Sequence, residues 1–320
     1  MDRADVLVVG AGVSGLTTSV RLAEHGVRVL IRAEAAPADT NSAAAGAIWD
    51  PIYAEHPRVP AWAEASYKVF SRMALENFPG VRLVRGVEAS RLPITSPGWA
   101  RELPGFKECT TDELPAGFVH GWHYTAPIID MPPYLAALQA MTLAYGAEMH
   151  FGERMTSLPD GFADAPIVVN CSGSGARHLV PDPTVQPIRG QLVAIKNPGH
   201  QEFFAEHTEQ LGEMIYLLPQ GDLLLLGGSA EEGIADPKPD PLVADAIMKR
   251  CGDIFPEIRT AEVVGHRGGI RPSRPVIRLE HENRGDRHIV HNYGHSGAGV
   301  SLSWGCADDV TEIVLGLLGR

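Results

Sequence analysis

The chain has 320 residues, of which 44% are hydrophobic and 21% charged, a composition that excludes a disordered chain, a collagen-like chain and a bundle of membrane helices. Its formal net charge is −12 and no run of lysine or arginine is present, so we expect neither nucleic acid nor a membrane as a partner. We expect about two domains in a monomer or a homodimer. The four cysteines form no CxxC pair and the first residues lead directly into a strand without a signal peptide, which indicates a cytoplasmic protein with free thiols.

The N-terminal segment predicts a βαβ unit. Residues 5–9 are a continuous apolar run, which is typical of a strand buried on both faces. A helix is expected over 13–25, where Gly26 ends it, and a second strand over 27–31 leads to Glu34. This order is that of the α/β folds that bind nucleotides.

The turn between the first strand and the helix has the spacing GxGxxG. Gly10 permits the tight turn, Gly12 lets the backbone approach a pyrophosphate, and Gly15 lets the helix pack closely on the strand. Glu34 lies where a carboxylate accepts hydrogen bonds from the two hydroxyls of a ribose. The pattern predicts a dinucleotide site, although a turn that only joins a strand to a helix has the same spacing. It does not distinguish NAD from FAD.

The α/β pattern returns later in the chain, between segments of a different character. A helix over 134–145 and strands over 148–151, 167–170 and 288–292 are expected, and a turn at 294–299 leads to a C-terminal helix. The intervening segments are rich in proline and tryptophan or contain a hairpin over 214–228, with a turn at 219–222. We therefore expect an α/β fold with a discontinuous Rossmann-like nucleotide domain and an inserted, sheet-containing second domain. The first is expected to comprise 1–51, 133–189 and 266–320, and the second 52–132 and 190–265.

Neither a metal site nor a serine hydrolase is predicted. His288, His291 and His295 lie close in sequence, but positions three apart in a strand point to opposite faces. No GxSxG motif exists, and Ser14 lies within the nucleotide turn.

Two arginines flank a proline in the segment 269–278. Its two prolines exclude a helix and favour extended backbone, so Arg271 and Arg274 point to opposite sides. At most one of them can enter a pocket. The other is expected to be a surface or interdomain charge, which is also the ordinary role of an isolated arginine.

Seven motifs taken together resemble the D-amino-acid oxidase family of flavoproteins. In chain order they are GAGVSGL (10–16), AAGAIWDP (44–51), VVNCSGSGA (168–176), PIRGQ (187–191), MIYLLP (214–219), GIRPSRPVIRLE (269–280) and HNYGHSGAGVSLSWG (291–305). The resemblance implies FAD in place of NAD and hydride transfer from Cα of a D-amino acid to flavin N5. With O₂ and water, the products are a 2-oxo acid, ammonia and hydrogen peroxide. Related amine oxidases of the glycine or sarcosine oxidase type share the fold and are an alternative, as is a flavin-binding protein without catalytic activity.

The resemblance assigns substrate contacts to three residues. Arg271 matches the arginine that binds the substrate α-carboxylate, Tyr216 matches a tyrosine that hydrogen-bonds the same group, and Gly297 matches the carbonyl that receives the amino group. A guanidinium binds a carboxylate through two parallel hydrogen bonds, which fixes its orientation. Tyr216 also shares a strand face with Met214 and Leu218, a pattern typical of a core tyrosine.

Asp50 and Met214 are further pocket residues. Asp50 lies where mammalian members carry a neutral glutamine near the substrate side chain, and the chain offers no matching cation for a second substrate carboxylate. We expect good oxidation of D-amino acids with neutral side chains, with cationic side chains as a further class, and poor oxidation of D-aspartate and D-glutamate. The alternative is that Asp50 faces solvent or caps the turn before Pro51.

The resemblance also implies FAD contacts along the chain. Val13 and Ser14 match pyrophosphate contacts, and Glu34 the ribose contact. The full set is Gly10, Gly12, Val13, Ser14, Gly15, Glu34, Ala45, Gly46, Met155, Ser172, Ser296, Gly297, Ala298, Gly299, Val300 and Ser301. Backbone N–H groups at the start of the C-terminal helix are expected to stabilise negative charge on the reduced flavin. Two positions depart from the family: Gly212 stands where vertebrate members carry a lid tyrosine, in a shortened loop, and Ala298 replaces a larger aromatic residue.

Overall fold

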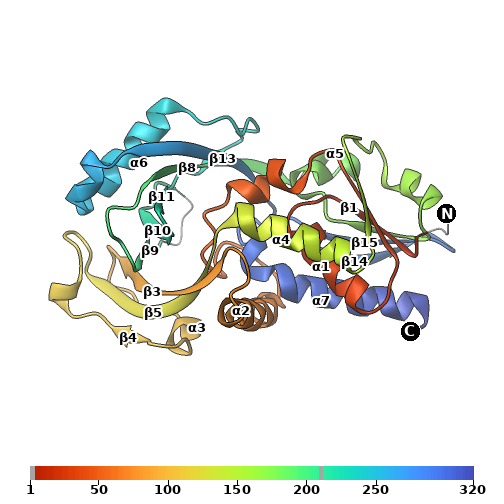
Figure 1. Ribbon diagram of the computed structural model, residues 1–320, viewed down its shortest axis with the longest axis horizontal. Helices are drawn as coiled ribbons and strands as arrows, with labels where there is room; N and C mark the ends of the chain where they lie inside the picture. Colours follow the sequence, from red (N-terminus) through yellow and green to blue (C-terminus); the bar gives the residue numbers. More distant parts are fainter. Residues whose placement is uncertain (1–3, 209–211) are drawn as a thin grey trace.

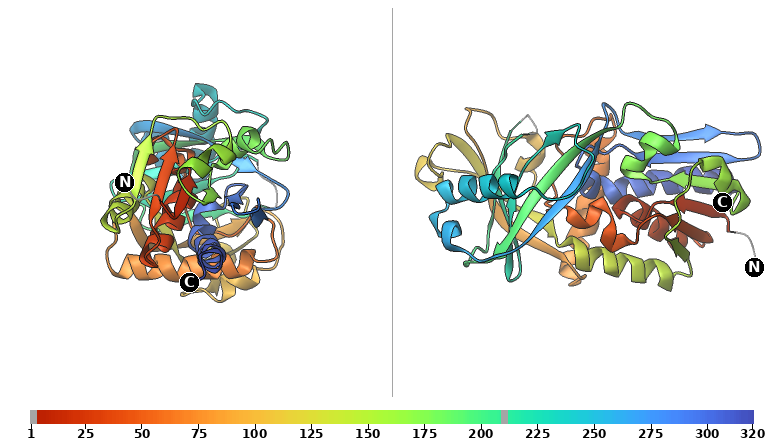
Figure 2. Two further views of the ribbon diagram at one scale, coloured as in Figure 1. Left: turned by 90° about the vertical axis from the view of Figure 1, so that its right-hand side faces the viewer. Right: turned by 90° about the horizontal axis from the view of Figure 1, so that it is seen from above.

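A six-stranded sheet forms one end of the elongated molecule, where both ends of the described chain lie, and a nine-stranded sheet forms the other end (Figures 1 and 2). The computed structural model describes residues 4–208 and 212–320. The segment around Gly212, expected to be a shortened lid, includes residues 209–211, which lie outside the described residues.

The six-stranded sheet has the order β14-β15-β7-β1-β2-β6. Its strands are β1 (Val6–Val9), β2 (Val29–Ala33), β6 (Glu148–Phe151), β7 (Ile167–Asn170), β14 (Arg278–Asn283) and β15 (His288–Tyr293). All neighbouring pairs are parallel except β14 with β15. This arrangement confirms the predicted α/β class.

Apolar packing covers both faces of this sheet, which explains the unbroken apolar run of β1. Val6 and Val8 pack into the larger core, while Leu7 and Val9 pack with Leu158 on the opposite face. Helix α1 (Val13–Glu24) lies beside α4 (Met131–Ala144) and α7 (Gly299–Leu318). The expected helix over 134–145 begins three residues earlier, at Met131, because prolines fit the first turn of a helix.

The nine-stranded sheet has the order β12-β8-β11-β10-β9-β3-β5-β4, with β13 paired to β8. Its strands are β3 (Val81–Ser90), β4 (Lys107–Glu108), β5 (His120–Ile129), β8 (Gln186–Lys196), β9 (Phe203–Glu206), β10 (Tyr216–Gln220), β11 (Leu223–Gly227), β12 (Glu231–Glu232) and β13 (Val263–Ser273). Helix α6 (Pro241–Ile254) covers one face, where Ile247 and Cys251 are buried. Helix α2 (Val59–Leu75) packs against α7.

Short helices and turns complete the chain. They are α3 (Gly98–Arg101), α5 (Ala176–Leu179), η1 (Pro37–Asp39), η2 (Asn41–Ala44), η3 (Thr111–Glu113), η4 (Leu158–Ala163), η5 (Gly173–Gly175) and η6 (Pro256–Thr260). Within the described ranges, no helix has both the length and the apolar character needed to cross a membrane.

The expected hairpin over 214–228 is present, but its turn is tighter than expected. Pro219 and Gln220 still pair with Leu224 and Leu223, so the turn consists of Gly221 and Asp222. The domain division stays a prediction. Two long strands cross its expected borders: β8 passes through 189/190 and β13 through 265/266, and these two strands lie side by side in Figure 1.

Candidate active site

A cavity of about 1150 Å³ connects the two sheets. At one end it reaches Gly10 after β1, Glu34 after β2 and Ser172 after β7. At the other end it reaches Tyr216 on β10 and Arg271 on β13. Ligands of open α/β sheets bind at the carboxyl ends of parallel strands, and this volume exceeds that of a usual small-molecule pocket.

The turn after β1 requires its glycines. Gly10 has φ of +110°, and a Cβ there would lie 2.5 Å from the carbonyl oxygen of Cys171. A Cβ on Gly15 would lie 1.9 Å from the carbonyl oxygen of Gly10. Helix α1 therefore begins directly against the strand, and its N-cap residue, Gly12, has no side chain that could cap it. Its N-terminus favours an anionic group in the adjoining cavity.

Ser42, which the sequence analysis did not single out, lies against this turn. Its Oγ accepts a hydrogen bond from the backbone N–H of Val13 at 3.0 Å, and a Cβ on Gly12 would lie 3.0 Å from the same oxygen. The expected phosphate contact of Val13 therefore involves an N–H that already has a partner. Glu34 lines the cavity with Arg154, whose Nε is 3.8 Å from Glu34 Oε2.

Arg271 and Tyr216 meet at the far end of the cavity. Nη1 of Arg271 donates to the carbonyl oxygen of Ser229 at 2.9 Å, and Arg271 also hydrogen-bonds Tyr216. Burial raises the pKa of Tyr216, although the charge of Arg271 opposes this shift, so the phenol keeps its proton at neutral pH. Gly297, with φ of +120°, lies beside them: a Cβ there would be 3.2 Å from Cδ of Arg271.

Three glycines make room for these two side chains. A Cβ on Gly190 would lie 2.4 Å from Nη1 of Arg271. A Cβ on Gly227 would lie 1.9 Å from Cζ of Tyr216, and one on Gly228 would lie 2.6 Å from its hydroxyl oxygen. A glycine inside or just after a strand is a sequence signal for such close approach, and it was available at each position.

Asp50 combines the two roles considered from the sequence. Asp50 lines the cavity, and its buried Oδ1 has no hydrogen-bond partner in the described part of the chain, while the N–H of Ile52 donates to the carboxyl in the turn around Pro51. Burial, followed by the negative charge of Glu88, raises the pKa of Asp50 well above its ordinary value. The backbone N–H of Asp50 donates to Ser301 Oγ at 3.0 Å, which ties this segment to α7.

The cavity wall contains most of the residues expected to contact cofactor or substrate, including Met214. Among the described residues, two of the expected set do not line it: Gly15, which packs beneath the turn, and Ser296. Ser296 Oγ accepts from the N–H of Arg274 and donates to its carbonyl oxygen, each at 3.1 Å. The expected residues that do line it are Gly10, Gly12, Val13, Ser14, Glu34, Ala45, Gly46, Asp50, Met155, Ser172, Met214, Tyr216, Arg271, Gly297, Ala298, Gly299, Val300 and Ser301.

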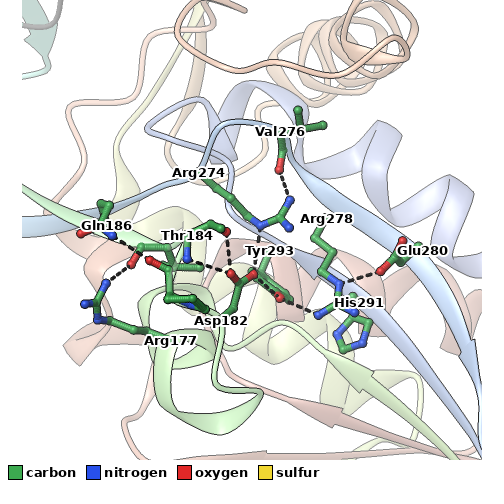
Figure 3. A network of polar contacts seen from close by, with 12 residues as sticks. Arg177, Asp182, Thr184, Gln186, Arg274, Val276, Arg278, Glu280, His291 and Tyr293 are labelled. Carbon is green, nitrogen blue, oxygen red and sulfur yellow. Dashed lines mark hydrogen bonds and ion pairs between the residues drawn. The ribbon is translucent and has the colours of Figure 1, made fainter.

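Arg274 points away from the cavity, as the alternation of extended backbone predicts. Its Nε donates to Asp182 Oδ2 at 3.0 Å, and the Tyr293 hydroxyl donates to the same oxygen at 2.8 Å (Figure 3). Burial alone would raise the pKa of Asp182, but hydrogen bonds from Thr184, Tyr293 and Arg274 outweigh it and hold the pKa well below its ordinary value. Arg274 is therefore a structural charge.

The three C-terminal histidines have separate partners. His291 lies between Asn170 and Glu282, and His288 contacts His281. His295 is fully buried, with Nε2 3.1 Å from Asn292 Oδ1, and burial lowers its pKa to about 4.

Comparisons with known proteins agree with this geometry. The model of the DAO family, described as FAD dependent oxidoreductase, matches residues 5–313. The chain is 42% identical to a D-amino-acid oxidase of Rubrobacter xylanophilus over 97% of this chain and 95% of that protein. It is 43% identical to a D-amino-acid oxidase of Streptomyces coelicolor over 97% of this chain and 96% of that protein. Its fold is that of the glycine oxidase of Geobacillus kaustophilus, with a TM-score of 0.84 at 22% identity over 98% of this chain and 95% of that one.

The cavity fits the cofactor that the family description states. The start of α1, whose N-cap residue is a glycine, and the turn that admits no Cβ suit a pyrophosphate, and the carboxylate of Glu34 suits a ribose. The start of α7 also lacks a side-chain cap and lines the cavity through Ala298, Gly299 and Val300.

Proposed function

The chain belongs to the DAO family of FAD-dependent oxidoreductases, and from this premise we propose that it oxidises D-amino acids with O₂ as the electron acceptor. The amino acid becomes an imino acid, which water converts to a 2-oxo acid and ammonia, while O₂ becomes hydrogen peroxide. Bound FAD supplies the two-electron acceptor for the hydride that leaves Cα. The observation that carries the proposal is the meeting of Arg271, Tyr216 and Gly297 at one end of a cavity whose other end suits a dinucleotide.

In this proposal the protein orients the substrate. The guanidinium of Arg271 binds the α-carboxylate, and the Tyr216 hydroxyl donates a further hydrogen bond to it. The carbonyl oxygen of Gly297 accepts from the substrate amine, which reacts in its neutral form. Three groups on three segments define which face of Cα is presented, and orientation of this kind accounts for much of an enzyme's rate enhancement.

The remaining roles follow from position. We assign cofactor contacts to the cavity-lining residues of the six-stranded sheet and of the start of α7, and substrate contacts to those of the nine-stranded sheet. This assignment corresponds to the domain division expected from the sequence. We place the enzyme in the cytoplasm, which is consistent with four cysteines that are all free.

Asp50 restricts the proposed substrates. Its buried, unpartnered Oδ1 and the neighbouring negative charge of Glu88 disfavour a second substrate carboxylate, so D-aspartate and D-glutamate are poor substrates. Neutral side chains fit without this cost, and a cationic side chain favours the ionised form of Asp50 and pairs with it. In Asp50→Asn, the preference for D-arginine over D-alanine therefore falls. Comparable efficiency of the wild type on D-aspartate and D-alanine would contradict this assignment.

Oxygen uptake across a panel of D- and L-amino acids, glycine and sarcosine tests the proposed reaction. We expect turnover of chiral D-amino acids and none of the L-enantiomers. Faster turnover of glycine or sarcosine than of every D-amino acid would instead identify a glycine or sarcosine oxidase. Failure of anaerobic D-alanine to bleach the flavin of the FAD-bound protein, together with no oxygen uptake on the whole panel, would identify a flavin-binding protein without this activity.

A further inference from the structure

Three potential metal ligands meet at the edge of the nine-stranded sheet, outside the cavity described above. Cys109 follows β4, Glu113 ends η3 and His123 lies on β5. The Cys109 Sγ, one carboxylate oxygen of Glu113 and one ring nitrogen of His123 all lie within 4.8 Å of one another. None of the three residues lines the cavity.

His123 provides a second, independent observation. His123 lies on β5 and only 8% of the residue is exposed, yet neither ring nitrogen has a hydrogen-bond partner among the described residues. Nε2 lies 3.7 Å from Glu113 Oε1, which is too far for a hydrogen bond. A buried polar group without a partner is costly, so a ligand for this ring would stabilise the protein. A metal ion between these two atoms would give Nε2 a partner.

We propose that Cys109, Glu113 and His123 bind a divalent transition-metal ion of the Zn²⁺ class, with water as a fourth ligand. A thiolate, an imidazole and a carboxylate form a donor set typical of Zn²⁺, whereas Mg²⁺ and Ca²⁺ take oxygen ligands. The thiol proton of Cys109 passes to solvent when the Zn–S bond forms. Because none of the three ligands lines the cavity, the ion holds the η3 loop to β5 and takes no part in substrate oxidation.

The surroundings of Glu113 orient it for this role. The backbone N–H of Thr110 donates to Oε2 at 2.8 Å and its hydroxyl does so at 3.1 Å, which leaves Oε1 directed toward His123. Hydrogen bonds of this kind commonly orient metal-binding carboxylates.

One cation competes for the same carboxylate. Nζ of Lys107, on an exposed side chain, lies 2.7 Å from Glu113 Oε1. A bound metal ion takes over this contact and releases the ammonium group to solvent. The site therefore binds its ion more weakly than the donor set alone would allow, and removal of Lys107 strengthens binding.

The sequence pattern does not predict this cluster of metal ligands. The spacing Cys-x₃-Glu-x₉-His contains no CxxC pair, and the three residues come together only because β4 pairs with β5 in antiparallel register, Lys107 opposite His123.

Calorimetric titration of chelator-treated, FAD-saturated protein with Zn²⁺ tests the proposal. We expect one ion per chain, about 10-fold or greater loss of affinity in Cys109→Ser, Glu113→Gln and His123→Gln, and tighter binding in Lys107→Met. His150→Gln is the matched control, because His150 is an exposed histidine on β6 whose Nε2 lies 3.9 Å from Glu148 Oε2. We expect the His150→Gln variant to bind Zn²⁺ with the affinity of the wild type.

The FAD content of each variant reports its folding. Glu113 is exposed, so Glu113→Gln keeps the test decisive if His123→Gln does not fold. The proposal is overturned by the absence of saturable binding, by equal affinities of the wild type and Glu113→Gln, by an equal loss in His150→Gln, or by Lys107→Met binding no more tightly than the wild type.

Discussion

The side chain of Arg271 lies directly against Gly297, at a distance where a Cβ on that glycine would be 3.2 Å from Cδ of the arginine. Arg274, three residues after Arg271, packs in the same way against Gly294, which lies three residues before Gly297: a Cβ on Gly294 would be 2.8 Å from Cδ of Arg274. The turn after β15 thus rests on two arginines of the preceding extended segment. This contact fixes the carbonyl group of Gly297 relative to the guanidinium proposed to bind the substrate.

Replacement of Arg271 by leucine removes the partner of the substrate carboxylate. A lost charged contact of this kind costs about 2–5 kcal/mol, which corresponds to a fall in kcat/KM of roughly 30- to several-thousand-fold. Steady-state kinetics on D-alanine measures the loss, and FAD content is expected to stay unchanged. Near-normal efficiency in Arg271→Leu, with activity abolished in a folded Arg274→Leu variant, would show that the two arginines have been assigned in reverse.

Gly190→Ala tests the space around Arg271. The added methyl group would lie 2.4 Å from Nη1, so the guanidinium must move, and a displacement of this order reduces kcat/KM about 10-fold or more. Gly265→Ala, on the neighbouring strand β13, is the control because a Cβ there meets no atom within 4 Å. Equal kinetics for the two variants would contradict the proposed position of Arg271 in catalysis.

Glu34→Lys is expected to weaken FAD binding. The change removes the proposed ribose acceptor and places a second cation beside Arg154, whose Nε lies 3.8 Å from Glu34 Oε2. We expect an increase in the Kd for FAD of about 10-fold, from the loss of about one charged hydrogen bond. Fluorescence titration of the apoprotein with FAD measures it, with the exposed Glu76→Lys as the control; an unchanged Kd in Glu34→Lys would remove Glu34 from the cofactor site.

Asp182→Asn is expected to change both the free energy of unfolding and the way in which this free energy depends on pH. The pKa of Asp182 is depressed in the folded protein, so its contribution is present above the unfolded-state pKa of 3.8 and is lost as pH falls below that value. The variant lowers the free energy of unfolding at pH 7 by about 1.5–3 kcal/mol, because a charged hydrogen-bond partner of Arg274 is lost. Urea denaturation at pH 7 and at decreasing pH is the measurement.

Asp286→Asn provides the comparison, since that side chain is 92% exposed. Equal losses of stability in the two variants would show that the network drawn in Figure 3 contributes little.

His295 makes the protein less stable in mild acid. Its pKa falls from 6.5 to about 4 on folding because the ring is buried. Between these two pH values the ring is protonated in the unfolded chain and neutral in the folded protein. The contribution of His295 to the free energy of unfolding is therefore most favourable above pH 6.5 and decreases by about 3 kcal/mol as pH falls toward 4. Urea denaturation from pH 7.5 to 4 is expected to show a flatter profile in His295→Gln than in the exposed control His25→Gln; parallel profiles would exclude His295 as the source.

Much of the six-stranded sheet was predictable because its signals are local. A single short window contains the apolar run before Gly10, the glycine spacing and the helix-ending Gly26. Strand β1 and helix α1 form where that window predicts them. The helix over 134–145 began earlier than expected because the prolines after Met131, which often end helices, here occupy a first turn.

The candidate site depended on more than local pattern. Alternation predicted that Arg271 and Arg274 face opposite sides, and family resemblance nominated Arg271, but only the register of β13 on β8 directs Arg271 over Gly190 and into the cavity. Only the tertiary structure shows that Asp50 has an unpartnered buried oxygen and that the charge of Glu88 lies near it.

By itself, the sequence determined the α/β class and the nucleotide turn, because backbone preferences and hydrophobic period act over a few neighbouring residues. The tertiary structure alone decided which distant groups share a site: Arg271 with Ser229, 42 positions away, or Cys109 with His123 at a sheet edge. Such long-range contacts depend on strand pairing and burial across the whole chain, which no short window of residues specifies.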